Sequence, residues 1–197
     1  MNNKPTEQVE YSEYLSEKYL PFRDQYLFSF YYPKLIKQFS PNTTIIDLGS
    51  GLGSFLRFCK KHKISAKGYD TNADMVAQCQ KAELDAKVAS VLGFPEASVK
   101  SAFCDNVLEH LTLEEIYTFF QNLKTKMISG GRLVMLVPGP VGFRKDHTHA
   151  TFVDVALIES ICKTMSLKLT KAFYHPFNCK FISRFLYLNM TVCVIDF

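Results

Sequence analysis

The sequence lacks several features that would place it in a specialised class of protein. No apolar run in its 197 residues reaches the roughly 18 residues that a membrane-spanning helix needs. Glycine and proline are sparse, at 9 and 8 residues, and only 21% of the residues are charged, which argues against disorder. Because 47% of the residues are hydrophobic, the chain fits one compact domain with a sizeable core.

A clustered positive charge is also lacking. The formal net charge is only +4, and the lysines are scattered along the chain instead of forming a basic stripe. The densest run is Lys60-Lys61-His62-Lys63, which we interpret as the solvated end of a helix. The sequence therefore gives no reason to predict a nucleic-acid partner.

The six cysteines are far apart and form no C-x-x-C pair, and most lie within apolar patterns. Free cysteine in such a pattern behaves as a small hydrophobic residue, so we expect neither a disulfide framework nor a cysteine metal site. Residues 1–7 are polar and lack the apolar region of a signal peptide. We therefore expect a reducing compartment, which favours the cytoplasm.

Strand and helix patterns alternate along most of the chain. Helix patterns cover residues 54–62, 73–81 and 154–165, and a fourth helix follows Thr112. Strand patterns cover residues 43–47, 66–70, 86–89, 101–105, 132–137, 167–174 and 190–197. The last two strands have no helix between them and should form a hairpin. The order predicts an α/β fold with a doubly wound, mostly parallel, Rossmann-like sheet of seven strands and a C-terminal antiparallel hairpin.

The helix after Thr112 has the clearest signature. Thr112 and Glu115 match a capping box, and the glycine pair Gly130-Gly131 is predicted to end the helix. Hydrophobic residues at helical spacing predict its buried face: Leu113, Ile116, Phe119, Phe120, Leu123 and Met127.

Residues 1–40 are predicted to form an N-terminal helical cap on a main domain that covers residues 41–197. The segment from about Val9 to Phe39 is rich in aromatic residues, and Pro21 and Pro33 divide it into short helical pieces. We expect these rings to pack against the sheet; lining a substrate cavity is the alternative.

A glycine turn follows the first predicted strand. Asp47 to Gly53 has the spacing D-x-G-x-G-x-G, whereas dinucleotide folds prefer G-x-G-x-x-G, whose glycines accommodate a pyrophosphate. A carboxylate at Asp47 is unfavourable for a pyrophosphate but suits an amino-acid ammonium. Asp70 ends the second strand, where an acid accepts hydrogen bonds from ribose hydroxyls. The pattern predicts an adenosine joined to an amino acid.

With these residues the chain resembles the class I S-adenosylmethionine-dependent methyltransferases, in their small-molecule or glycan branch. The resemblance covers about residue 43 to the C-terminus. Its motifs are the glycine turn, Asp70 and three further segments. The first segment follows the fourth strand and is Asp105-Asn106-Val107-Leu108-Glu109-His110-Leu111, and the second leads into the fifth strand and is Ser129-Gly130-Gly131-Arg132-Leu133-Val134. The third resembles a polar segment over the active site and is Asp146-His147-Thr148-His149-Ala150-Thr151-Phe152.

The resemblance implies S-adenosyl-L-methionine as cofactor, with the glycine turn under its methionine part and Asp70 on its ribose. The residues that it assigns to the cofactor are Asp47, Gly49, Ser50, Gly51, Gly53, Asp70, Thr71, Ser90, Asp105 and Asn106. One position departs from the family. The acid that usually binds adenine after the third strand is replaced by Ala89-Ser90-Val91-Leu92, so we expect Ser90 or nearby backbone to take its place.

Methyl transfer is an in-line displacement, for which alignment supplies most of the rate. A base is needed only when the acceptor must lose a proton. We predict His149 or His147 as that base, with Asp146 or Asp154 to orient it. The D-H-x-H string lacks a third and a fourth ligand at plausible spacing, so no metal is expected.

Glu109-His110 is a second pair of interest. Glu109 could contact the cofactor or the cap, and His110 is expected to pack against the end of the sheet. Structural anchoring and catalysis both remain open for this pair.

The sequence thus predicts an S-adenosylmethionine-dependent methyltransferase with a small-molecule or glycan-type acceptor, through an oxygen nucleophile. The alternatives are an RNA or protein methyltransferase, a nicotinamide-dependent oxidoreductase, or a non-catalytic cofactor-binding module. The glycine spacing and Asp47 disfavour the oxidoreductase. No membrane span is predicted, and the pattern indicates no particular oligomeric state.

Overall fold

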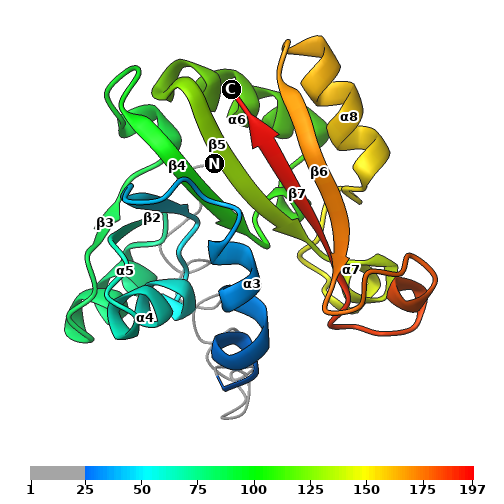
Figure 1. Cartoon of the computed structure of the whole chain (residues 1–197), viewed down its shortest axis with the longest axis horizontal. Coiled ribbons are helices and arrows are strands. Elements are labelled where there is room, and N and C mark those ends of the chain that lie inside the picture. Colours follow the sequence, from blue (N-terminus) through cyan, green and yellow to red (C-terminus); the bar gives the residue numbers. More distant parts are fainter. Residues whose placement is uncertain (1–24) are drawn as a thin grey trace.

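The computed structural model describes residues 25–197, and a seven-stranded mixed sheet forms its centre (Figure 1). The strands are β1 (Ile45–Leu48), β2 (Ala66–Asp70), β3 (Ala86–Val88), β4 (Val99–Asp105), β5 (Met127–Val137), β6 (Lys168–His175) and β7 (Met190–Asp196). Their order in the sheet is β3-β2-β1-β4-β5-β7-β6. The first five strands pair in parallel, whereas β7 pairs antiparallel with both β5 and β6. The predicted α/β fold and its C-terminal hairpin are confirmed.

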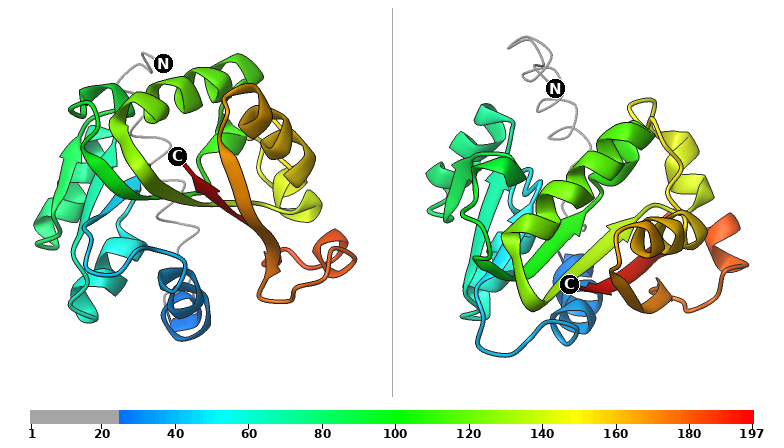
Figure 2. Two further views of the ribbon diagram at one scale, coloured as in Figure 1. Left: turned by 45° about the horizontal axis from the view of Figure 1, so that its top comes forward. Right: turned by 90° about the horizontal axis from the view of Figure 1, so that it is seen from above.

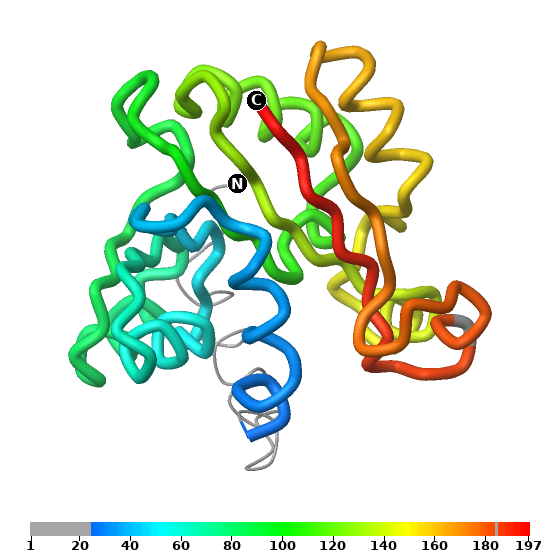
Figure 3. Tube along the Cα trace, in the orientation of Figure 1, coloured from blue at the N-terminus to red at the C-terminus, as the bar shows by residue number. Residues whose placement is uncertain are grey.

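Figure 3 shows where the C-terminal strand enters the sheet: β7, in red, lies between β5 and the orange β6. The register aligns Arg132 of β5 with Asp196 of β7. Their side chains form a bidentate ion pair, with Nε–Oδ1 and Nη2–Oδ2 distances of 2.6 and 3.0 Å. This pair fixes the end of the chain to the centre of the sheet.

Helices cover both faces of the sheet (Figure 2). The α-helices are α3 (Tyr32–Ile36), α4 (Ser54–Lys61), α5 (Ala73–Lys81), α6 (Leu113–Lys126), α7 (Pro140–Lys145) and α8 (Val155–Thr164). A π-helix, η1 (Leu27–Tyr31), precedes α3, and short 3-10 helices are η2 (Val91–Gly93), η3 (Leu108–His110) and η4 (Ile182–Arg184). Side chains of α3 and α4 pack on one face, and those of α6 and α8 pack on the other.

The period-two pattern of the central strands explains these two layers. In β5, Val134 and Leu136 face the layer of α3 and α4, whereas Leu133, Met135 and Val137 face the layer of α6 and α8. All five side chains are at most 1% exposed. Covering a parallel sheet on both faces requires such a continuous apolar run.

The described part of the predicted cap packs against the sheet, as the aromatic pattern indicated. Tyr31 and Tyr32 are each 2% exposed and belong to the core cluster that contains Phe55 and Phe103. The ring of Tyr32 lies 5.3 Å from that of Phe55 in an edge-to-face arrangement. The rest of the predicted cap, residues 1–24, lies outside the described residues, and the division at residue 40 stays a prediction.

Two predictions for α6 were wrong. The helix ends at Lys126 and β5 begins at once, so Gly130 and Gly131 lie inside a strand and do not end the helix. Their backbone groups pair with Phe197. The N–H of Gly130 donates to the carbonyl of Phe197 at 2.8 Å, and the N–H of Phe197 donates to the carbonyl of Gly131 at 2.9 Å. Leu113 is 48% exposed because it lies in the first turn, beyond the face that packs on the sheet.

The capping box of α6 is confirmed. Thr112 Oγ1 accepts from the backbone N–H of Glu115, and Glu115 Oε2 accepts from the N–H of Thr112 at 2.9 Å. Thr112→Ala should therefore lower the free energy of unfolding by about 1 kcal/mol in urea titrations. Thr118→Ala, on the exposed surface of the same helix, is the matched control and should change it by less than about 0.5 kcal/mol. Equal losses would contradict the capping role.

Within residues 25–197, no helix combines the length and apolar character that a membrane span needs. All six cysteines are free thiols; five are buried and Cys179 is exposed.

Candidate functional site

The turn after β1 uses its own backbone N–H groups internally. Gly51 N–H donates to Oδ2 of Asp70 at 2.8 Å. Gly49 and Ser50 both donate to the carbonyl of Tyr69, at 2.8 and 3.2 Å. A pyrophosphate at a helix N-terminus needs such groups as donors. This turn is therefore not built for a dinucleotide.

The three glycines of the turn have left-handed backbone angles, with φ of 73° at Gly49, 51° at Gly51 and 78° at Gly53. A Cβ atom at Gly49 would overlap Cγ2 of Val107, so this glycine lies against the protein. A Cβ at Gly51 would meet only Sδ of Met75, at 3.9 Å. Gly51 thus leaves open space beside the turn, which a ligand can approach.

Three carboxylates gather at the carboxyl ends of β1, β2 and β4. Asp47 is 2% exposed, and burial, together with the neighbouring Asp105 and Asp70, raises its pKa well above the usual value. Burial also raises the pKa of Asp70, although its oxygens accept from the N–H groups of Gly51 and Asn72. A nearby cation favours ionised carboxylates, whereas a phosphate disfavours them. The site is therefore suited to a positively charged ligand.

The other predicted cofactor residues lie along the same edge of the sheet. Asn106 has a positive φ of 55°, and its Nδ2 donates to Oδ1 of Asp105 at 2.8 Å. Ser90 is exposed at the start of η2, and the N–H of Ala89 holds this segment to the carbonyl of Asp70 at 3.0 Å. Thr71 is exposed after β2. Their contacts with the cofactor stay predictions.

The predicted catalytic residues separate into different environments. Asp146 Oδ1 accepts from both the N–H and the hydroxyl of Thr148, at 3.1 and 2.7 Å, and so shapes the turn. His147 is exposed, whereas the side chain of His149 is only 7% exposed. His149 Nδ1 lies 2.9 Å from the carbonyl of Phe143, so it donates there and leaves the lone pair on Nε2. Of the two histidines, only His149 has the geometry of a positioned base.

Glu109 and His110 were not assigned to the site from the sequence, yet they lie beside His149. The Nε2 of His149 is 4.0 Å from Oε1 of Glu109, and the rings of His110 and His149 are 4.8 Å apart. The N–H groups of Ala150 and Thr151 donate to the Glu109 carbonyl at 2.7 and 3.1 Å and hold the two segments together. His110, which we expected to pack against the end of the sheet, thus also contacts the ring of His149. We call Glu109, His110 and His149 the Glu–His–His cluster.

Burial dominates the electrostatics of this cluster. Glu109 is fully buried, and burial, with the negative charges of Asp105 and Asp146, raises its pKa to about 8. A buried acid with a strongly raised pKa, in contact with a histidine, is typical of a functional site.

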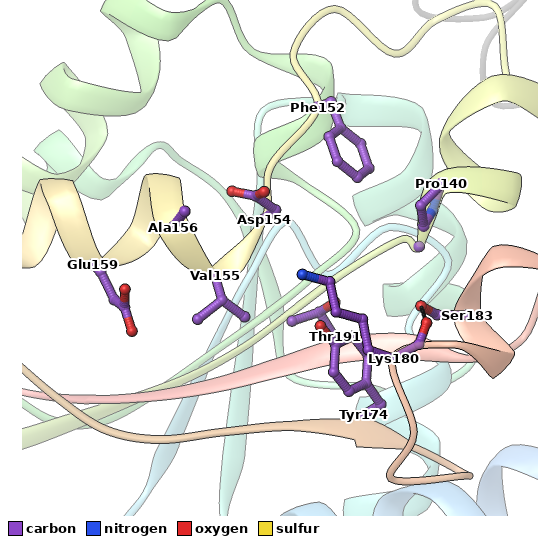
Figure 4. Close-up of a pocket in the computed structure, with 11 residues that line it drawn as sticks. Pro140, Phe152, Asp154, Val155, Ala156, Glu159, Tyr174, Lys180, Ser183 and Thr191 are labelled. Atoms are coloured by element: carbon purple, nitrogen blue, oxygen red, sulfur yellow. Dashed lines mark hydrogen bonds between the residues drawn. The ribbon is translucent and has the colours of Figure 1, made fainter.

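A cleft of about 370 Å³ lies beside α8, η4, β6 and β7, and the three residues of the cluster are not among those that line it (Figure 4). Phe152, Asp154, Tyr174, Lys180 and Thr191 are among the side chains that line it. The Phe152 ring lies 5.3 Å from Phe143, whose ring stacks on His149 at 5.4 Å. The cleft therefore combines an aromatic ring, both signs of charge and hydroxyl groups, and the rings of Phe152 and Phe143 connect it to His149.

Comparison with known proteins gives a consistent result. A family described as "Methyltransferase domain" matches residues 46–135, which include the glycine turn, Asp70 and Glu109. No protein of curated function matches the sequence.

Similar solved structures include S-adenosylmethionine-dependent methyltransferases. One from Archaeoglobus fulgidus is 18% identical with a TM-score of 0.71, over 88% of this chain and 92% of that one. Another, from Mesorhizobium loti, is 15% identical with a TM-score of 0.65, over 84% and 97% of the two chains. Magnesium protoporphyrin IX methyltransferase from Synechocystis, with bound S-adenosylmethionine, is 12% identical with a TM-score of 0.63, over 100% and 85%.

The residues around the turn fit S-adenosylmethionine. Asp47, Asp70 and Asp105 suit a ligand that carries a sulfonium and an ammonium, and Gly51 leaves room for it beside the turn. Within the turn, the N–H groups of Gly49, Ser50, Gly51 and Gly53 are already engaged inside the protein. Fold, family match and site therefore agree: residues 46–135 form a methyltransferase domain, and the fold and the site support S-adenosylmethionine as its cofactor.

Proposed function

We propose that this methyltransferase acts on an oxygen atom of a small-molecule or glycan-type acceptor. The observation that carries the proposal is the Glu–His–His cluster, which the rings of Phe143 and Phe152 connect to the cleft. S-adenosylmethionine supplies a methyl group that leaves its sulfonium sulfur for an acceptor lone pair, and a hydroxyl acceptor must then lose its proton. A buried, positioned histidine and carboxylate can promote that loss.

The cleft supports an acceptor of limited size. Its volume of about 370 Å³ is in the range of small-molecule pockets, roughly 300–1,000 Å³. Lys180, Asp154 and Tyr174 are among the side chains that line the cleft (Figure 4). Aromatic rings interspersed with charged and hydroxyl groups suit a polar ring or a sugar better than an apolar chain.

The test is a methyl-transfer assay with labelled S-adenosylmethionine. We expect label in hydroxyl-bearing small molecules or sugars from a metabolite extract, at an oxygen atom of the product. Label in RNA or in protein, or on nitrogen or carbon of a small molecule, would refute the proposed acceptor. The same assay on RNA and on protein fractions gives the labelling against which that of the metabolite extract is compared.

Asp70→Asn tests the proposed ribose contact. The substitution removes the negative charge and keeps one of the two oxygens, so only one of the N–H groups of Gly51 and Asn72, which donate to Oδ2 and Oδ1, retains its acceptor. The affinity for S-adenosylhomocysteine in calorimetry should fall roughly 10- to 150-fold, the loss expected for a charged hydrogen bond. Asp85→Asn, on an exposed loop, is the control and should leave the affinity unchanged. Equal affinities for both variants would remove Asp70 from the ribose site.

A further inference from the structure

Glu109 has an environment that a carboxyl group rarely keeps without a ligand. The residue is 0% exposed, and neither Oε1 nor Oε2 has a hydrogen-bond partner among the described residues. An unpaired buried carboxyl group carries a large desolvation cost. Buried polar groups in native proteins are otherwise paired almost without exception. The site therefore indicates a partner that the protein side chains do not supply.

Two histidines lie around these oxygens. One ligand atom of each of Glu109, His110 and His149 can be chosen so that all three atoms lie within 4.8 Å of one another. His149 donates Nδ1–H to Phe143 and so presents the lone pair of Nε2, which is 4.0 Å from Oε1 of Glu109. Neutral imidazole with one nitrogen engaged is the form that binds metals.

The tautomer of His110 follows from its neighbours. The hydroxyl of Thr148 donates its only hydrogen to Asp146, at 2.7 Å. Thr148 Oγ1 must then accept from Nδ1 of His110, at 3.1 Å. His110 therefore carries its proton on Nδ1 and its lone pair on Nε2, the same tautomer as His149.

We propose that Glu109, His110 and His149 form a binding site for a divalent transition-metal cation. One carboxylate and two imidazoles are ligands that Zn²⁺, Mn²⁺, Fe²⁺ and Co²⁺ accept. Ligand atoms around such a cation lie about 3.4 Å apart in tetrahedral geometry. The 4.0 Å between Glu109 and His149 needs only a small side-chain movement to reach that value.

The surroundings of the cluster match those of metal sites. Metal-binding histidines usually donate their second ring nitrogen to a carbonyl, a carboxylate or a similar acceptor. Phe143 supplies a carbonyl to His149, and Thr148, itself held by Asp146, supplies a hydroxyl to His110. Each ring thus has its Nδ1 held by a neighbouring residue.

The sequence alone predicted no metal, because the D-H-x-H string offers too few ligands. The fold adds a ligand from a distant segment: the N–H groups of Ala150 and Thr151 bind the Glu109 carbonyl and bring the η3 turn against His149. Three protein ligands leave coordination positions open, as in catalytic sites. A cation there would occupy the Nε2 lone pair of His149, so His149 would act through the cation and not as a base itself. The cation would bind an acceptor hydroxyl and lower its pKa, and this role rests on the proposed function.

The test measures metal binding directly, without methyl donor or acceptor. Tag-free full-length protein, stripped with a chelator, is titrated with Co²⁺ and followed by its d–d absorption and by calorimetry. We expect one Co²⁺ per chain, without the thiolate charge-transfer bands that Cys179 would give. Glu109→Gln and His149→Ala should each weaken binding by at least about 100-fold.

His62→Ala is the control, because His62 is exposed at the end of α4 and should not change Co²⁺ affinity. Far-UV circular dichroism establishes that each variant is folded. Absence of stoichiometric binding, or equal binding by the wild type and Glu109→Gln, would overturn the proposal. The proposal of an oxygen acceptor is tested separately, because the methyl-transfer assay identifies the atom of the product that carries the label.

Discussion

His149→Ala is expected to lower kcat by about 100-fold while the affinity for S-adenosylhomocysteine stays the same. The side chain is 7% exposed, and its Nδ1 is held by the carbonyl of Phe143, so its Nε2 points at Glu109 instead of at solvent. Removing a positioned group that promotes proton loss costs 10²–10⁴-fold in typical enzymes. Steady-state kinetics with the identified acceptor and calorimetry with S-adenosylhomocysteine measure the two quantities.

His147→Ala provides the comparison that the sequence could not resolve. Both histidines belong to the same D-H-x-H string, but His147 is exposed and lies outside the Glu–His–His cluster. Its substitution should change kcat by less than about twofold. If His147→Ala were the more damaging variant, or if His149→Ala weakened cofactor binding as much as turnover, the assignment of His149 would be wrong.

Local signals predicted much of the fold. The helix over 73–81 was predicted to the residue, because Asn72 caps it: Oδ1 of Asn72 accepts from the N–H groups of Asp74 and Met75. The strand over 66–70 was also exact. Signals of this kind lie within a few residues of the element that they define, so a single sequence contains them in full.

The errors arose where distant pairing overrides a local signal. Gly130 and Gly131 resemble a helix stop, but their backbone groups are engaged by Phe197 at the other end of the chain. Strand β5 therefore extends back to Met127, which is aligned with Val99 across a shift in register. Helix α7 was missed because only Pro140 at its first turn marks its start.

The same contrast between local signals and distant contacts applies to the candidate site. The glycine turn and Asp70 could be predicted because each ends a strand, and the carboxyl ends of parallel strands meet at one edge of the sheet. The contact between Glu109 and His149 could not be predicted from the sequence, because it depends on how the segment after α7 folds back over η3. The Glu109-His110 pair was noticed in the sequence, but nothing there indicates which distant histidine it meets.

Gly49→Ala is expected to lower the free energy of unfolding by about 2–5 kcal/mol. The φ of 73° places this residue in the left-handed region, where a side chain costs about 1–2 kcal/mol. The new Cβ would also overlap Cγ2 of Val107, and overpacking of this kind adds about 1–3 kcal/mol. Urea denaturation followed by circular dichroism measures the loss.

Substitutions at two other glycines separate the effect of backbone strain from the effect of steric overlap. At Gly93 the φ is not positive and a Cβ would lie 3.5 Å from Cβ of Ala89, an ordinary contact, so Gly93→Ala should change stability by less than about 0.5 kcal/mol. Gly51→Ala carries backbone strain without overlap and should cost about 1–2 kcal/mol. Because Gly51 faces the open space beside the turn, its variant should lose affinity for S-adenosylhomocysteine beyond what its stability explains. A Gly51→Ala protein that binds normally would mean that the cofactor does not approach the turn from this side.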